Sequence, residues 1–202
     1  VQMVFSEDMA DAFCRALNDW LVKEWLDKDD RLRGSIVIPV QSIEKAVAEI
    51  ERCAQDKRFV QVLMLVMGDM PLGKRHYWPI YAAAERLGLP IGIHAGSAYH
   101  NPPSSVGWGS YHIEDYVAQA QAFQTQLTSL IVEGVFARHP KLKMVMLESG
   151  FTWLPPFLWR LHKFWRGVRM ETPWVDRPPL EIVRSNIRFS LQPFDAPPDA
   201  AT

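Results

Sequence analysis

The chain has 202 residues, of which 48% are hydrophobic and 22% charged, which suits one globular domain with a sizeable core. Its formal net charge of −1 gives no electrostatic basis for binding nucleic acid or an anionic membrane surface, so we expect neither as a partner. No apolar run is long enough to span a bilayer, and no secretory leader is recognisable. Cys14 and Cys53 lack a CxxC spacing, which indicates free thiols in a reducing compartment, and we expect a cytoplasmic protein.

Predicted helices and strands alternate along the whole chain. Helices are recognised by apolar residues at helical spacing, and strands by short, nearly continuous apolar runs. In chain order the predicted elements are a helix over 7–26, a strand over 34–39, a helix over 43–53, a strand over 59–66, a helix over 77–87, a strand over 90–94, one or two helices over 113–138, a strand over 142–147, a helix over 157–168, a short helix over 180–185 and a strand over 187–191. Ser6 and Ser42 are the expected N-caps of the first two helices.

The stretch Leu89–Gly96 carries the first candidate for chemistry. Its β-branched residues predict a strand that ends at His94, and the small Ala95 and Gly96 leave room for a ligand or metal to approach the backbone. In parallel α/β folds the chemistry lies at the carboxyl ends of the strands. His94 is therefore a candidate functional residue, and the alternative is a strand-end histidine bonded to a loop carbonyl.

The predicted strands are apolar on both faces, which is typical of a parallel sheet covered by helices. A nucleotide-binding open sheet would show a glycine-rich turn after its first strand, and the segment 39–42 is not of that kind. His94, Glu148 and Gln192 each follow a strand, which favours a barrel. We predict one α/β domain over residues 1–202, a (β/α)₈ TIM-barrel type that is incomplete, with about five βα units and open sheet edges.

Five segments in this order carry a resemblance to a known family: Ala16–Leu21, Arg31–Pro39, Gly92–Gly96, Leu147–Pro155 and Leu191–Asp195. Together they resemble the amidohydrolase-related family of the aminocarboxymuconate-semialdehyde decarboxylase and γ-resorcylate decarboxylase type. The resemblance covers nearly the whole chain. It implies a metal-dependent (β/α)₈ barrel, with zinc or manganese as the divalent metal.

The resemblance implies a metal-ligand role for His94, which matches the histidine at the end of the family's fifth strand. A neutral imidazole suits zinc and manganese alike. The family's acidic or histidine pair of strand 1 and its aspartate of strand 8 have no match here, so we expect those ligands outside residues 1–202. One imidazole does not hold a catalytic metal, which needs three or more protein ligands.

Glu148 stands where the decarboxylases of this family carry a histidine followed by glycines. It is a candidate general acid/base, since a carboxyl group desolvated among Leu147, Phe151 and Trp153 would have a raised pKa. The alternative is a glutamate paired with an arginine below the rim. The departure from histidine leaves both hydrolysis and decarboxylation open.

Four further residues are candidates for substrate binding. By resemblance, Arg160 matches an arginine that grips a substrate carboxylate across a dimer interface, which a planar guanidinium suits. A surface salt bridge is the alternative. Tyr99 and Trp108, in a long loop, could stack on a planar substrate or simply pack the loop down. Gln192 follows the last predicted strand and is the fourth candidate. Because the arginine of the family acts across a dimer interface, we also expect a homodimer or higher oligomer.

Two classes of function follow. The first is a metal-dependent hydrolase or carbon–carbon lyase acting on a small carboxylated substrate of aromatic or unsaturated origin. The second is a catalytically incomplete barrel segment with a structural or interaction role. A nucleotide-binding protein is disfavoured because no phosphate loop is present.

Overall fold

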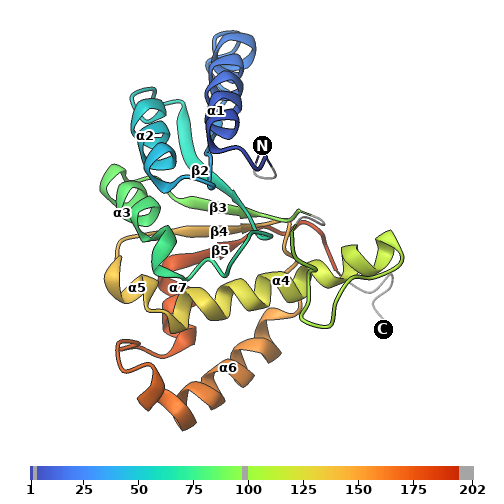
Figure 1. The fold of residues 1–202 in the computed structure, drawn as a ribbon. Coiled ribbons are helices and arrows are strands. Elements are labelled where there is room, and N and C mark those ends of the chain that lie inside the picture. The colour runs from blue at the N-terminus through green and yellow to red at the C-terminus, as the bar shows by residue number, and fades with distance from the viewer. Residues whose placement is uncertain (2–3, 97–99, 196–202) are drawn as a thin grey trace.

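Five parallel strands in sequence order form the centre of the molecule (Figure 1). The computed structural model describes residue 1 and residues 4–96 and 100–195. The strands are β1 Gly34–Val37, β2 Phe59–Leu65, β3 Ile91–His94, β4 Met144–Leu147 and β5 Ile187–Phe189, and each pairs in parallel with the next. Because the order never reverses, the sheet has the topology of a (β/α) barrel and not of a doubly wound sheet. The predicted fold, a partial barrel with five strands and open edges, is confirmed.

Helices connect the strands and lie along the outside of the curved sheet (Figure 1). They are α1 Glu7–Leu21, α2 Ile43–Cys53, α3 Trp78–Leu87, α4 His112–Val132, α5 Val135–Arg138, α6 Leu154–Val168 and α7 Pro179–Asn186. A π-helical turn, Val22–Leu26, continues α1, and short 3-10 turns lie at Arg75–Tyr77 and Arg169–Glu171. Ser6 caps α1 by accepting the Met9 N–H at 3.3 Å. Ser42 occupies the N-cap position of α2, as predicted, but its side chain makes no capping hydrogen bond.

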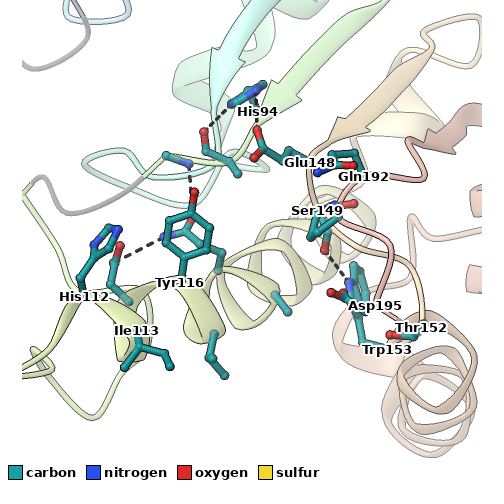
Figure 2. A pocket seen from close by; sticks show the side chains of 17 residues that line it. His94, His112, Ile113, Tyr116, Glu148, Ser149, Thr152, Trp153, Gln192 and Asp195 are labelled. Carbon is teal, nitrogen blue, oxygen red and sulfur yellow. Dashed lines mark hydrogen bonds and ion pairs between the residues drawn. The ribbon is translucent and has the colours of Figure 1, made fainter. Parts of the chain in front are cut away.

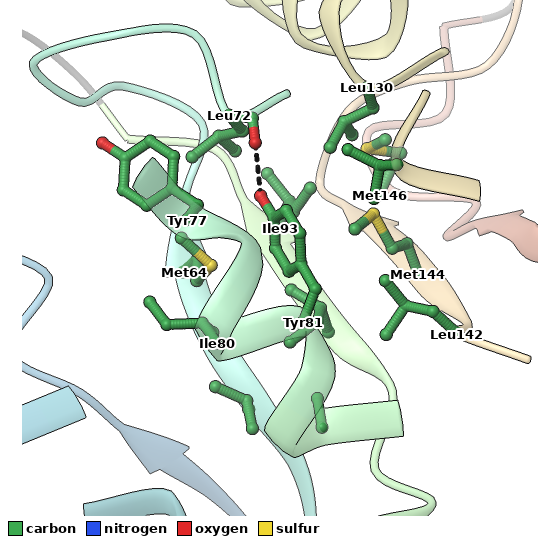
Figure 3. Close-up of a cluster of buried hydrophobic side chains, with 14 of the residues drawn as sticks. Met64, Leu72, Tyr77, Ile80, Tyr81, Ile93, Leu130, Leu142, Met144 and Met146 are labelled. Atoms are coloured by element: carbon green, nitrogen blue, oxygen red, sulfur yellow. Dashed lines mark hydrogen bonds between the residues drawn. The ribbon is translucent and has the colours of Figure 1, made fainter. Parts of the chain in front are cut away.

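The hydrophobic core fills the space between the sheet and these helices (Figure 3). Strand residues of one face, such as Met64, Ile93 and Met146, are almost completely buried. Tyr81 of α3 packs among them, and its hydroxyl donates to the Leu72 carbonyl at 2.6 Å. Each such buried apolar side chain contributes roughly 1.5–3 kcal/mol. Alternate strand residues on the opposite face, including Val145, are only half-buried. In a closed barrel that face is the interior.

A buried polar network joins α1, α2 and the edge strand β1. Glu49 is fully buried and accepts from Asn18 Nδ2 at 2.8 Å, Arg52 Nη2 at 2.7 Å and Cys53 Sγ at 3.3 Å. Burial alone would raise the pKa of Glu49, but the hydrogen bonds from Arg52, Asn18 and Cys53 outweigh it and hold the pKa below its ordinary value. Asn18 also pairs with both backbone groups of Val37, donating at 2.9 Å and accepting at 3.0 Å. The network therefore covers part of the β1 edge.

Cys14 and Cys53 are buried free thiols, as predicted. Burial raises the pKa of each to about 12, so neither is a reactive thiolate at neutral pH. In the part of the chain that the structure describes, no helix is long and apolar enough to cross a membrane. The cytoplasmic location stays a prediction.

Candidate active site

An open cleft of about 1010 Å³ lies at the carboxyl ends of β3, β4 and β5, beside the first turns of α4 (Figure 2). His94, Glu148 and Gln192 all line it, so the prediction that these three residues share one end of the sheet is confirmed. The other polar side chains that line the cleft are His112, Asp115, Tyr116, Gln119, Ser149, Thr152 and Asp195. The sheet topology thus assembles a site from segments about a hundred residues apart.

His94 has a different partner at each ring nitrogen (Figure 2). Its Nδ1 lies 2.5 Å from the Ala95 carbonyl oxygen, and its Nε2 lies 3.1 Å from Glu148 Oε2. A proton on Nδ1 satisfies the carbonyl and leaves the Nε2 lone pair facing the cleft, which is the usual arrangement of a metal-binding histidine. A second proton makes an imidazolium that pairs with Glu148. The carbonyl bond considered as the alternative is therefore present, and it is compatible with a ligand role.

Glu148 reaches His94 through an unusual backbone conformation. Its φ of 56° is in the left-handed region, where a non-glycine residue costs roughly 1–2 kcal/mol. The Glu148 N–H donates to Ser190 Oγ at 2.8 Å. The side chain is 39% exposed, so the expected enclosure among Leu147, Phe151 and Trp153 is not found, because the turn directs the carboxylate toward the open cleft. Among the described residues, the partner of its side chain is His94 and not an arginine.

The first turns of α4 supply a second polar wall. The Gly96 N–H donates to Gln119 Oε1 at 3.2 Å, and Gln119 Nε2 lies 3.5 Å from Asp115 Oδ1. Asp115 Oδ2 is buried and has no hydrogen-bond partner among the described residues. Sequence alone does not single out Asp115 or Gln119. Their spacing from His112 does place all three on one helix face, which is a usable clue once α4 is known to border the cleft.

The remaining predicted substrate-binding residues lie elsewhere. Arg160 is exposed on α6 and Trp108 is 57% exposed, and neither lines the cleft. Tyr99 lies outside the described residues. No lysine or arginine is among the cleft-lining residues in the described ranges, so these residues offer no cation to a substrate carboxylate. The roles of Arg160, Trp108, Tyr99 and Gln192 stay predictions.

The donors in the cleft fit a divalent metal in kind but not in number. His94 offers an oriented imidazole nitrogen with a carboxylate beside it, and manganese and zinc accept both donor types. Within residues 1, 4–96 and 100–195, no group of three or more His, Cys, Asp or Glu could hold a metal ion. A catalytic metal at His94 therefore requires additional ligands.

Comparisons with known proteins find relatives along most of the chain. A γ-resorcylate decarboxylase of Rhodococcus jostii (strain RHA1) is 28% identical over 189 residues, which cover 89% of this chain and 55% of that protein. An amidohydrolase of Mycobacterium avium subsp. paratuberculosis K-10 superposes with a TM-score of 0.74 at 26% identity, covering 95% of this chain and 51% of that one. A dihydroxybenzoic acid decarboxylase of Polaromonas sp. JS666, solved with bound manganese and 2-nitroresorcinol, shares the fold with a TM-score of 0.73 at 20% identity, over 93% of this chain and 59% of that one.

The chain spans about half the length of the curated relatives it matches. The family model described as Amidohydrolase matches residues 1–202. The resemblance found in the sequence is thereby confirmed, and the chain belongs to the amidohydrolase family.

Proposed function

We propose that the full-length protein is a metal-dependent decarboxylase of the amidohydrolase family acting on an aromatic carboxylate. The observation that carries the proposal is His94, whose Nδ1 is held by a backbone carbonyl while Nε2 faces the cleft beside Glu148. The similarity to γ-resorcylate decarboxylases supports the reaction class. The manganese in the Polaromonas structure supports a divalent metal, with manganese as the first candidate and zinc as the second.

The metal would be held here by His94 Nε2, with its other ligands supplied from outside the described residues. When bound, it would polarise an oxygen of the substrate and so stabilise negative charge that develops during the reaction. The substrate would lie between the strand ends and α4, where the cleft has room for a substituted benzene ring. The ring could then stack on the cleft-lining Tyr116 or Trp153.

Glu148 would act as the proton donor. In decarboxylation the bond between the ring carbon and the carboxylate breaks, carbon dioxide leaves, and the ring carbon takes up one proton. The Glu148 carboxyl group, which lines the cleft, would deliver that proton to the ring carbon. Gln192, at the end of β5, can donate hydrogen bonds from its side-chain amide to substrate oxygens.

Arg160 would bind the substrate carboxylate only in an oligomer. It is exposed on α6 and absent from the cleft lining, so it reaches a cleft only if a second copy of the chain docks with its α6 beside that cleft. We retain the homodimer as part of the proposal for this reason. An arginine from a second copy would supply the cation that the cleft-lining residues lack.

The test is a decarboxylation assay on the full-length protein. We expect release of carbon dioxide and resorcinol from γ-resorcylate, loss of this activity on dialysis against a chelator, and its return with Mn²⁺. A matched control is His76→Ala, which removes an exposed imidazole outside the cleft and should leave the activity unchanged. Hydrolysis of an amide or lactone probe without decarboxylation of any hydroxybenzoate would contradict the proposal.

A further inference from the structure

The hydrogen-bond ladder between β4 and β5 ends in an irregular way. The Ser190 N–H donates to the Met146 carbonyl at 3.0 Å, which is a regular bond of this parallel pair. In an unbroken parallel ladder the Ser190 carbonyl would then accept the Glu148 N–H. Instead, the Glu148 N–H donates to the Ser190 hydroxyl oxygen at 2.8 Å. A side chain therefore replaces the backbone acceptor at the point where the chain leaves the sheet.

The hydroxyl group of Ser190 both accepts and donates a hydrogen bond. While it accepts from Glu148, it also donates to the Gln192 carbonyl at 3.2 Å. Glu148 and Gln192 both line the cleft, whereas Ser190 does not. One hydroxyl thus ties together the ends of two neighbouring strands, each of which presents a polar side chain to the cleft.

This bond acts on Glu148, the one non-glycine residue with a positive φ among the described residues. The φ of Glu148 is 56°, and this left-handed turn brings its carboxylate to 3.1 Å from His94 Nε2. The preceding residue is fixed independently, because the Leu147 carbonyl accepts the Ala95 N–H at 3.1 Å. Beyond Leu147, the bond to Ser190 is the hydrogen bond that holds the Glu148 backbone.

We propose that Ser190 is a positioning residue, which fixes the Glu148 backbone so that the carboxylate faces His94. The inference rests on the proposed function in so far as Glu148 acts there, and it adds a residue that never touches the substrate. Loss of the hydroxyl frees the Glu148 N–H and lets the turn relax toward ordinary φ values. The carboxylate then spends less time beside His94.

The test compares three single variants of the full-length protein. Ser190→Ala removes the hydroxyl, and Ser190→Thr keeps it. Ser185→Ala is the matched control, since it also removes a hydrogen-bonded serine hydroxyl, which donates to the Glu181 carbonyl at 2.6 Å in α7 and is outside the cleft. We expect kcat for γ-resorcylate to fall on the order of ten- to a hundredfold in Ser190→Ala at nearly unchanged KM, as for other misplacements of about 1 Å. Ser190→Thr and Ser185→Ala should stay near wild type.

If the wild-type protein is active on γ-resorcylate, two results would overturn the inference. The first is a Ser190→Ala enzyme with wild-type kcat, and the second is an equal loss in Ser185→Ala, which would indicate general destabilisation. If the wild-type protein does not decarboxylate γ-resorcylate, the proposed function fails and Mn²⁺ affinity decides the role of Ser190. A Kd about tenfold weaker in Ser190→Ala than in Ser185→Ala would then support it, because a misplaced Glu148 carboxylate no longer contacts the proposed ligand His94, and equal Kd values would overturn it.

Discussion

The imidazole of His94, at the end of β3, contacts the carboxylate of Glu148, which directly follows β4. Sequence identifies both residues, because each follows a buried strand and the carboxyl ends of parallel strands meet. It does not reveal their direct contact of 3.1 Å, which depends on the left-handed turn at Glu148. Nor does it reveal Asp115 and Gln119, whose place in the cleft depends on the direction in which α4 crosses the strand ends.

Replacing His94 by alanine should remove metal and activity together. The side chain is 41% exposed at the rim and contributes little to packing, so we expect the free energy of unfolding to change by less than about 1 kcal/mol. Metal content by elemental analysis, decarboxylase activity and urea unfolding measure the three quantities. Full metal occupancy in the variant would exclude His94 as a ligand.

Replacing Glu148 by glycine should give a more stable protein than replacing it by alanine, with the same loss of activity. Glu148→Gly relieves the left-handed strain, whereas Glu148→Ala removes the same carboxylate and keeps the strain. We therefore expect Glu148→Gly to be more stable than Glu148→Ala by about 1 kcal/mol in urea unfolding, with equal loss of kcat. Equal stability of the two variants would show that the turn is not strained.

At the scale of helices and strands, periodicity predicts the presence of the elements well and their ends less well. The helix expected over 157–168 begins at Leu154, because Pro155 and Pro156 are tolerated in the first turn of a helix. The segment over 113–138 is two helices separated at Gly134, which has a φ of 83°. A Cβ there would lie 2.5 Å from the Trp174 ring, so this break depends on a contact with a distant residue.

The junction of α1, α2 and β1 should give the protein a defined sensitivity to acid. The lowered pKa of Glu49 means that its ionised form stabilises the fold above the ordinary value of 4.5, and that this contribution is lost as the pH falls below that value. We expect Glu49→Gln to reduce the free energy of unfolding at pH 7 by about 2 kcal/mol, and by less at pH 3.

Urea unfolding at the two pH values measures this difference. Glu51→Gln is the matched control, since Glu51 pairs with Arg86 at the surface, where an ion pair is worth about 0–1 kcal/mol. A Glu49→Gln penalty that does not depend on pH would mean that the carboxylate charge is not what stabilises the junction.

At the scale of the whole molecule, the sheet has two edges that differ in their cover. Asn18 occupies both backbone groups of Val37 on the β1 edge. On β5, the strand at the other end, the described residues form no further strand pair beyond the one with β4. Unpaired strand edges promote association. We expect residues 1–202 produced alone to associate, as measured by size-exclusion chromatography with light scattering, and a monodisperse, thermally stable monomer would contradict this.

Among the residues that the structure describes, those lining the cleft all lie at or after His94, and β1, β2 and the helices before them contribute none. The residues before β3 therefore contribute two strands and their helices to the fold, whereas the later residues contribute three strands and the described lining of the cleft. If the proposed function holds, we expect substitutions in the cleft loops to change substrate preference while leaving the core of β1, β2 and their helices intact. Directed evolution of this protein would accordingly sample residues 94–96, 112–120, 148–153 and 192–195 first.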